Sequence, residues 1–280
     1  MSTAVSEPVG TELPMREATA TSRRVHPLDV VTSWPVARII GSRDIKVKYK
    51  QSILGPAWLL IQPLGLLTAI TIAFSGVTDV STGDVPYVVF GLVGVCVWNF
   101  ISMTLAIAPQ AFLTNQALIK RSPTPRMAFI TASIVSNLPL LAFMLLVTVV
   151  ASTISEGFRV QFLLMPILVA WLLVFVWSIV LLIAPVASRF RDAVAVVPLL
   201  IQVGVFLAPI GYSLESAPSN IKLLLSINPV TGIVESWRWM LLGLDPSLEV
   251  IAVSAGWTVI LLFAGWQVYR RMEVRLADFV

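Results

Sequence analysis

The sequence predicts an all-α integral membrane protein with six transmembrane helices, an N-terminal amphipathic interface helix, and a re-entrant helical pair between spans five and six. The first observation is composition: of 280 residues, 57% are hydrophobic and 12% are charged, whereas an average soluble domain has about 25% charged residues. The second observation is that the charges avoid the long apolar stretches. Together they exclude a soluble globular enzyme, a disordered chain and a disulfide-rich scaffold.

Six uncharged stretches are long enough for helices of about 20 residues, the length that crosses the hydrocarbon core of a bilayer. The expected spans are residues 57–77, 86–108, 128–154, 161–184, 193–212 and 250–269. They belong to a transmembrane domain that we expect over residues 34–275. Residues 1–33 are polar and lack an apolar run, which predicts a flexible cytoplasmic tail.

The positions of Lys and Arg orient the spans, because loops rich in these residues stay in the cytoplasm. If both termini are cytoplasmic, only Arg159, Lys222 and Arg238 of the 19 basic residues fall on the outer side. The sequence therefore predicts a multi-pass protein of the cytoplasmic (inner) membrane with both ends inside. The net charge of +4 is explained by this topology and does not indicate nucleic-acid binding.

A helix is expected just before the first span. Ser33 can cap it, and Pro35 then falls in its first turn, where a missing N–H is harmless. Apolar and basic residues follow at helical spacing as far as Lys50. This pattern predicts a helix that lies in the membrane interface and contacts lipids.

Two short apolar segments meet at Asn228-Pro229, between spans five and six. They predict two helices that enter the outer leaflet and return, with their irregular backbone covered by protein or water. Glu235 and Arg238 are three residues apart on the second of these helices and could form a re-entrant pair. A solvated outer loop is the alternative.

The spans carry no chemistry of their own. Their cores contain no Asp, Glu, Lys, Arg or His, and the chain has one His and one Cys, so we expect no metal site and no catalytic group. No Gly-Lys-Ser or Gly-Lys-Thr occurs, which leaves no nucleotide-binding P-loop. The chain is therefore expected to be a non-enzyme without a cofactor, and uphill transport would need energy from another subunit.

Three segments resemble the permeases of type-2 ABC exporters, in particular those of the polysaccharide export family, which move O-antigen, capsule, teichoic acid or galactan. They occur in the family's order and span about residues 35–275. The first is RDIKVKYKQSILGPAW (43–58) with QPL (62–64), the second is SRFRD (188–192) with APIGY (208–212), and the third is NPVTGIVE (228–235), leading to LG (242–243).

The resemblance implies the transmembrane subunit of an ATP-driven exporter of a lipid-linked polysaccharide. Such a subunit works as a homodimer with two separate ATP-binding cassette subunits, which hold ATP and Mg²⁺. The resemblance also implies that the helix before span one and the loop between spans two and three touch the ATPase. The ATPase-coupling candidates are Arg43, Asp44, Lys46, Lys48, Asn115, Leu118, Lys120, Arg121, Arg189, Arg191 and Asp192. Positive-inside anchoring is the alternative role for the last three.

Aromatic side chains are the candidates for the substrate path, because a flat apolar ring with a polar tip suits a sugar ring. They are Trp58, Phe74, Trp98, Phe206, Tyr212, Trp237 and Trp239. Packing and the interfacial aromatic belt are the alternatives for each of them. Two other functions remain open: a type-2 ABC permease for a drug or lipid, and a passive channel or scaffold.

Overall fold

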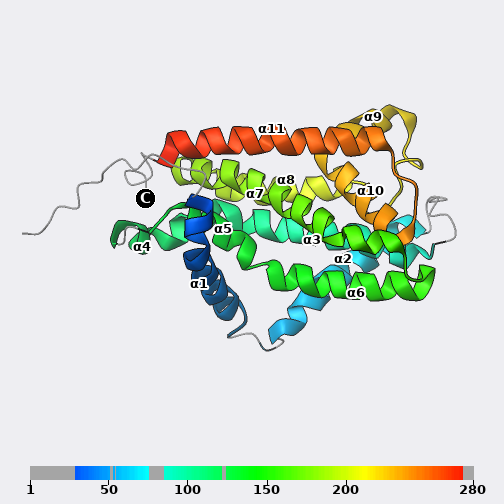
Figure 1. Cartoon of the computed structure of the whole chain (residues 1–280), viewed down its shortest axis with the longest axis horizontal. Coiled ribbons are helices and arrows are strands. Elements are labelled where there is room, and N and C mark those ends of the chain that lie inside the picture. The colour runs from blue at the N-terminus through cyan, green and yellow to red at the C-terminus, as the bar shows by residue number, and fades with distance from the viewer. Residues whose placement is uncertain (1–28, 51–52, 54, 76–84, 122–123, 274–280) are drawn as a thin grey trace, which may run out of the picture.

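The computed structural model describes residues 29–50, 53, 55–75, 85–121 and 124–273, and this part of the chain forms an elongated bundle of helices without a β-strand (Figure 1). The α-helices are α1 (Asp29–Lys50), α2 (Trp58–Ser75), α3 (Tyr87–Ile107), α4 (Gln116–Arg121), α5 (Met127–Val135), α6 (Leu138–Glu156), α7 (Met165–Arg189), α8 (Ala193–Leu207), α9 (Ser219–Ile227), α10 (Pro229–Leu242) and α11 (Leu248–Glu273). Short 3-10 segments are η1 (Gly55–Ala57), η2 (Ala108–Gln110), η3 (Leu113–Asn115) and η4 (Val160–Leu164).

Four helical segments of the described chain are long and apolar enough to cross a membrane, and they correspond within a few residues to predicted spans two, three, four and six. These are Tyr87–Gln110, Met127–Glu156, Val160–Arg189 and Leu248–Glu273. The described apolar helices at predicted spans one and five, Ile61–Ile72 and Ala193–Leu207, are shorter. The all-helical class is thus confirmed, and the count of six spans stays a prediction.

Predicted span three is divided into α5 and α6. The helix breaks at Ser136 and Asn137, and Pro139 follows near the start of α6. Proline lacks an N–H and is favoured in the first turn of a helix, so Pro139 suits the start of a new helix here. The membrane-length segment Met127–Glu156 is therefore interrupted between α5 and α6.

Helix α3 forms the centre of the bundle, since 78% of its apolar window is buried, compared with 22% for α11. Helices α7 and α11 pack side by side and run in the same direction. Trp171 on α7 donates its indole N–H to Thr258 on α11 at 3.0 Å. Seven residues further along both helices, the backbone of Ser178 lies close to Gly265. Parallel packing is what alternating spans require of predicted spans four and six.

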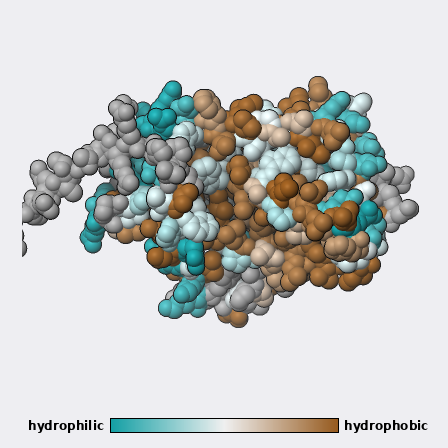
Figure 2. All heavy atoms as spheres, viewed as in Figure 1, coloured by the Kyte–Doolittle hydropathy of each residue, from teal (hydrophilic) through white to brown (hydrophobic). Residues whose placement is uncertain are grey.

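Hydrophobic residues form a broad middle band on the face shown in Figure 2, and hydrophilic residues gather at both ends of the molecule. One end contains α1 and α4, and the other contains α9 and the start of α11 (Figure 1). We call these the α4 end and the α9 end. A band of this kind matches the hydrocarbon layer and its two polar boundaries.

The structure corrects the predicted start of the first helix. Helix α1 begins at Asp29, so Ser33 is a buried residue inside the helix and Pro35 lies beyond the first turn. The helix includes the last residues of the predicted tail. Its buried face, which includes Ser33, Ala37 and Gly41, packs against α5. This tertiary contact outweighs the single backbone hydrogen bond that Pro35 removes.

The predicted break at Asn228-Pro229 is confirmed. Asn228 caps α10 by accepting a hydrogen bond from the N–H of Val230 at 2.9 Å, and Pro229 occupies the first position of the helix. Helix α10 ends at Leu242 and is followed by Gly243, whose φ of 73° lies in the left-handed region that glycine adopts readily. Entry of this helical pair into the outer leaflet stays a prediction.

Candidate functional site

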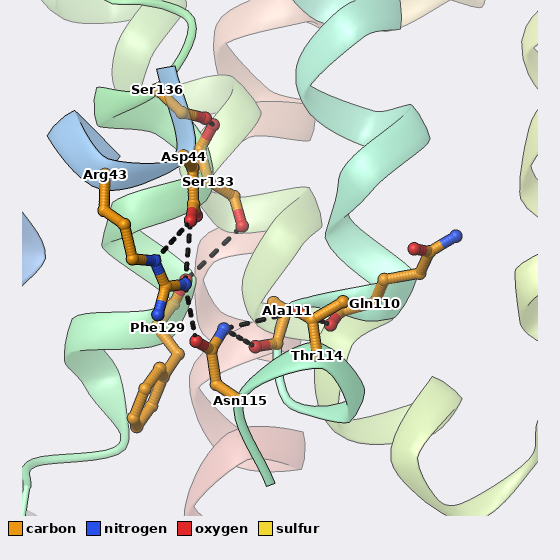
Figure 3. Close-up of polar contacts among 9 residues, drawn as sticks. All are labelled: Arg43, Asp44, Gln110, Ala111, Thr114, Asn115, Phe129, Ser133 and Ser136. Atoms are coloured by element: carbon orange, nitrogen blue, oxygen red, sulfur yellow. Dashed lines mark hydrogen bonds and ion pairs between the residues drawn. The ribbon is translucent and has the colours of Figure 1, made fainter. Parts of the chain in front are cut away.

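A hydrogen-bonded latch connects α1 to the loop between the second and third predicted spans (Figure 3). Arg43 on α1 donates from Nε and Nη2 to Oδ1 of its neighbour Asp44, at 3.0 and 2.7 Å, and from Nη2 to Oδ1 of Asn115 at 2.8 Å. Asn115 lies in η3 and is 6% exposed. We call Arg43, Asp44 and Asn115 the latch.

The Asn115 side chain is held from both ends. Its amide nitrogen donates to the carbonyl of Ala111 at 2.9 Å and to Oγ1 of Thr114 at 3.3 Å. This leaves its amide oxygen facing Arg43 (Figure 3). A planar guanidinium can contact a carboxylate and an amide at once, whereas a lysine ammonium has no such fixed fork. The latch therefore fixes the position of α1 relative to η3.

The other predicted coupling residues are exposed around the latch and at the junction of α7 and α8. These are Lys46, Lys48, Leu118, Lys120, Arg121, Arg189, Arg191 and Asp192. The Arg189 guanidinium lies over the ring of Phe190, 5.2 Å from its centroid. Partial desolvation lowers the pKa of the Lys48 ammonium. The set forms an exposed, mostly basic surface, as a docking face for another protein or for lipid headgroups requires.

The face of α1 turned away from α5 lines an open groove beside the latch. Its lining residues are Pro35, Arg38, Ile39, Ser42, Arg43, Lys46, Val47 and Lys50. Cationic and apolar side chains alternate along it. No cluster of three or more His, Cys, Asp or Glu gathers anywhere in the described residues, so no metal ligand set stands out there.

Glu235 and Arg238 form an ion pair on α10, and their role as a re-entrant pair stays a prediction. Nη1 of Arg238 lies 3.2 Å from Oε1 of Glu235, and Arg238 is 0% exposed. Its guanidinium lies over the Phe90 ring on α3, with Cζ 3.7 Å from the ring centroid. It also donates to two backbone carbonyls, those of Ile210 at 2.8 Å and Tyr212 at 3.2 Å. Arg238 is therefore a buried cation with four partners.

The predicted substrate-path aromatics divide into buried and exposed groups. Trp98 and Trp237 are buried, at 7% and 0% exposed, so they pack inside the chain and do not reach its surface. Phe206 and Trp58 are exposed, and Tyr212 and Trp239 are half-buried. The side chain of Phe74 lies outside the described part of the chain. The six described rings are thus divided between the interior and the surface of the chain.

Sequence reasoning missed two residues that surround Arg238. Tyr87 and Phe90 lie on the first turn of α3, and the Tyr87 hydroxyl donates to the carbonyl of Gly211 at 2.6 Å. They come from the start of an apolar helix, where nothing local marks them as partners of a residue 150 positions away. The only available signal was the Glu-x-x-Arg spacing among large apolar neighbours.

Comparison with known proteins places these features in a family. The sequence matches the ABC-2 type transporter family over residues 36–242. It is 22% identical to the O-antigen export system permease protein RfbA of Klebsiella pneumoniae over 249 residues, covering 86% of this chain and 93% of the relative. It is 24% identical to the RfbA protein of Myxococcus xanthus, covering 85% and 92%. It is 25% identical to the polysialic acid transport protein KpsM of Escherichia coli, covering 82% and 91%. The chain belongs to the ABC-2 type transporter family.

Proposed function

We propose that this chain is the membrane-spanning permease subunit of an ATP-driven exporter that moves a lipid-linked polysaccharide across the cytoplasmic membrane. The observation that carries the proposal is the family match over residues 36–242 together with end-to-end similarity to permeases for O-antigen and polysialic acid. In this proposal the chain works as a homodimer with two separate ATP-binding cassette subunits. Those partners hold ATP and Mg²⁺, and this chain hydrolyses nothing.

The ATP-binding subunits would dock at the α4 end. Two features support this: the exposed basic residues there, and the latch that ties α1 to η3. Closure of the ATPases would push on this connected pair of elements, and the push would reach α5 through the packed face of α1. The α1 helix would lie in the cytoplasmic interface, with its lysines and arginines against lipid headgroups.

The path for the polymer would run beside α8. This helix exposes a row of large apolar side chains, namely Val196, Leu199, Leu200, Val203, Phe206 and Leu207. The second copy of the chain would cover part of this row and leave the rest facing the path. Phe206, which is 72% exposed, offers a flat face for a sugar ring.

Reconstitution tests the proposal directly. The chain is co-purified with its ATP-binding subunit and placed in vesicles that carry a lipid-linked polysaccharide on the side where ATP is added. We expect polymer to appear on the opposite side only with ATP, as measured by its accessibility to a membrane-impermeant glycosidase or antibody. The control is the same complex with the catalytic glutamate of the ATP-binding subunit replaced by glutamine.

Other outcomes would reject the proposal. Movement of a fluorescent lipid or a drug, with polymer left in place, would indicate a lipid or drug permease. Solute flux without ATP would indicate a passive channel. Absence of an associated ATPase, with no ATP-dependent movement of any kind, would indicate a scaffold.

A further inference from the structure

The turn that follows α8 is held by side chains from three other segments. Helix α8 ends at Leu207, and the chain continues without helical structure through Ala208–Tyr212, which we call the outer turn. A turn of this kind exposes backbone carbonyls, and at membrane depth each of them needs a donor from the protein. The donors here come from α3, from α10 and from the residue that precedes α10.

Four backbone carbonyls of this region receive hydrogen bonds from side chains. Asn228 Nδ2 donates to the carbonyl of Leu207 at 2.7 Å, and the Tyr87 hydroxyl donates to that of Gly211 at 2.6 Å. Arg238 supplies the other two, to Ile210 at 2.8 Å and Tyr212 at 3.2 Å. Of these three donors, Arg238 alone binds two carbonyls of the turn.

The outer turn is also seated against α3 without a gap. A Cβ atom added to Gly94 would lie 2.4 Å from the carbonyl oxygen of Ile210, well inside van der Waals contact. The Ile210 carbonyl therefore rests on the α3 backbone on one side and accepts from Arg238 on the other. Close packing of this kind prevents the turn from moving any nearer to α3.

The contacts of the buried Arg238 guanidinium are better suited to fixing the position of the outer turn than to raising the stability of the fold. Replacing a buried ion pair by apolar residues of similar size is often neutral for stability, so the pair itself is weak evidence of a stabilising role. The planar fork of arginine, however, satisfies two carbonyls, the Glu235 carboxylate and the Phe90 ring at the same time. Neither lysine nor methionine can make that set of contacts.

We propose that Arg238 is a positioning residue for export: it fixes the outer turn, and with it the outer end of α8 that carries Phe206, against α3 and α10. The role of Arg238 in export rests on the proposed function, whereas its role in positioning the outer turn rests on the contacts described above. In this view α8 and α10 move as one unit at the α9 end, because the guanidinium joins them.

The test uses the full chain with its ATP-binding subunit in vesicles. A nitroxide is placed at position 206 through Phe206→Cys, and the single native cysteine, Cys96, stays silent because it is buried. Arg238→Lys keeps the charge and loses the fork, and Arg238→Met keeps the volume and loses the charge. We expect both to raise the mobile fraction of the spectrum at least about twofold, since charge-assisted hydrogen bonds to the turn are lost. Polymer exported per ATP hydrolysed should fall by a similar or larger factor.

The matched control is the second Glu–Arg pair at the α9 end. Arg159 lies 3.8 Å from Glu156, also three residues apart, but its side chain is 32% exposed. Arg159→Lys should leave both the spectrum and the export ratio at the wild-type level.

Other results of these measurements would overturn the positioning role of Arg238 or the proposed function. Wild-type mobility in both Arg238 variants, or raised mobility with an unchanged export ratio, would overturn the proposal. If Arg238→Met does not accumulate in the membrane, Arg238→Lys carries the decision alone. If the wild-type complex moves no polymer, the proposed function fails, while the mobility comparison still reports on the positioning of the turn.

Discussion

At single positions, the absence of a side chain sets how closely two helices or a helix and a turn can approach. Gly94 lets the outer turn touch α3, and Gly265 lets α11 touch α7, where an added Cβ would lie 2.5 Å from the carbonyl of Ser178. Both contacts are with backbone atoms, which cannot rotate away as a side-chain tip can. Small residues that permit such close approach are a main source of helix association in membranes.

Gly94→Ala should therefore destabilise the protein and disturb the outer turn. The new methyl group must push the Ile210 carbonyl away, and overpacking of this kind costs about 1–3 kcal/mol. The measurement is the thermal unfolding midpoint of the purified protein in one detergent. Gly256→Ala on α11 is the control, since a Cβ there meets nothing within 4 Å. Equal midpoints for the two variants would contradict the close seat of the turn.

The burial of Glu235 and Arg238 could not be predicted from the sequence. Glu235 and Arg238 were recognisable as a possible pair from their spacing, but their burial was not. Charged residues in an outer segment are usually solvated, and Arg238 is buried only because two carbonyls and an aromatic ring from distant segments surround it. Such partners are assembled by the tertiary fold and leave no local pattern.

Among the elements, helix positions were predictable where length and polarity alone decide them. The long apolar segments ending near Gln110, Glu156, Arg189 and Glu273 follow from runs of uncharged residues. The break before α10 follows from Asn228-Pro229, a cap followed by a proline at the first position. The predicted start of α1 was wrong, because burial of one face of the helix against α5 overrides the local cap and proline signals at Ser33 and Pro35.

The latch gives a prediction at this scale. Arg43→Met should weaken the connection between α1 and η3, since it removes the donors to both Asp44 and Asn115. We expect the rate of transport per bound ATPase to fall about threefold to tenfold, as the loss of one charged hydrogen-bond network predicts. The measurement is ATP-dependent polymer movement at saturating ATP-binding subunit.

Arg38→Met is the matched control for the latch, because it removes the same charge from the same helix one and a half turns earlier. If both variants lose transport equally, the effect belongs to the net charge of α1. If neither does, the latch plays no part in coupling.

For the whole molecule, an apolar middle between two hydrophilic ends follows directly from the long uncharged runs of the sequence. Exposed basic residues lie on α1, on α4 and at the end of α7, and hydrophobic residues form the middle band of the face shown in Figure 2. Which residues touch within each end could not be predicted, because helix rotation and tilt depend on packing between spans.

The α4 end supports a prediction about assembly. Reversing two of its charges, with Lys120→Glu and Arg121→Glu together, should raise the Kd for the ATP-binding subunit about tenfold at low ionic strength. The difference should shrink above about 0.5 M salt, where exposed charges are screened over a few ångströms. The measurement is a titration of labelled ATP-binding subunit onto the purified permease.

Lys222→Glu, on the exposed face of α9, is the control for this titration. A Kd shift as large as that of the double variant would place docking away from the α4 end. A shift that persists unchanged at high salt would show that the contacts are not mainly ionic.

The length of α8 has a consequence for the lipid around the protein. With 15 residues, the helix rises about 22 Å, whereas the hydrocarbon layer is about 30 Å thick. Wherever α8 faces lipid, the bilayer must become thinner or tilt its acyl chains to meet the outer turn, a hydrophobic mismatch that carries an energy penalty for each ångström. Lipids with longer acyl chains would therefore strain the annulus beside α8 before the annulus beside the four membrane-length segments.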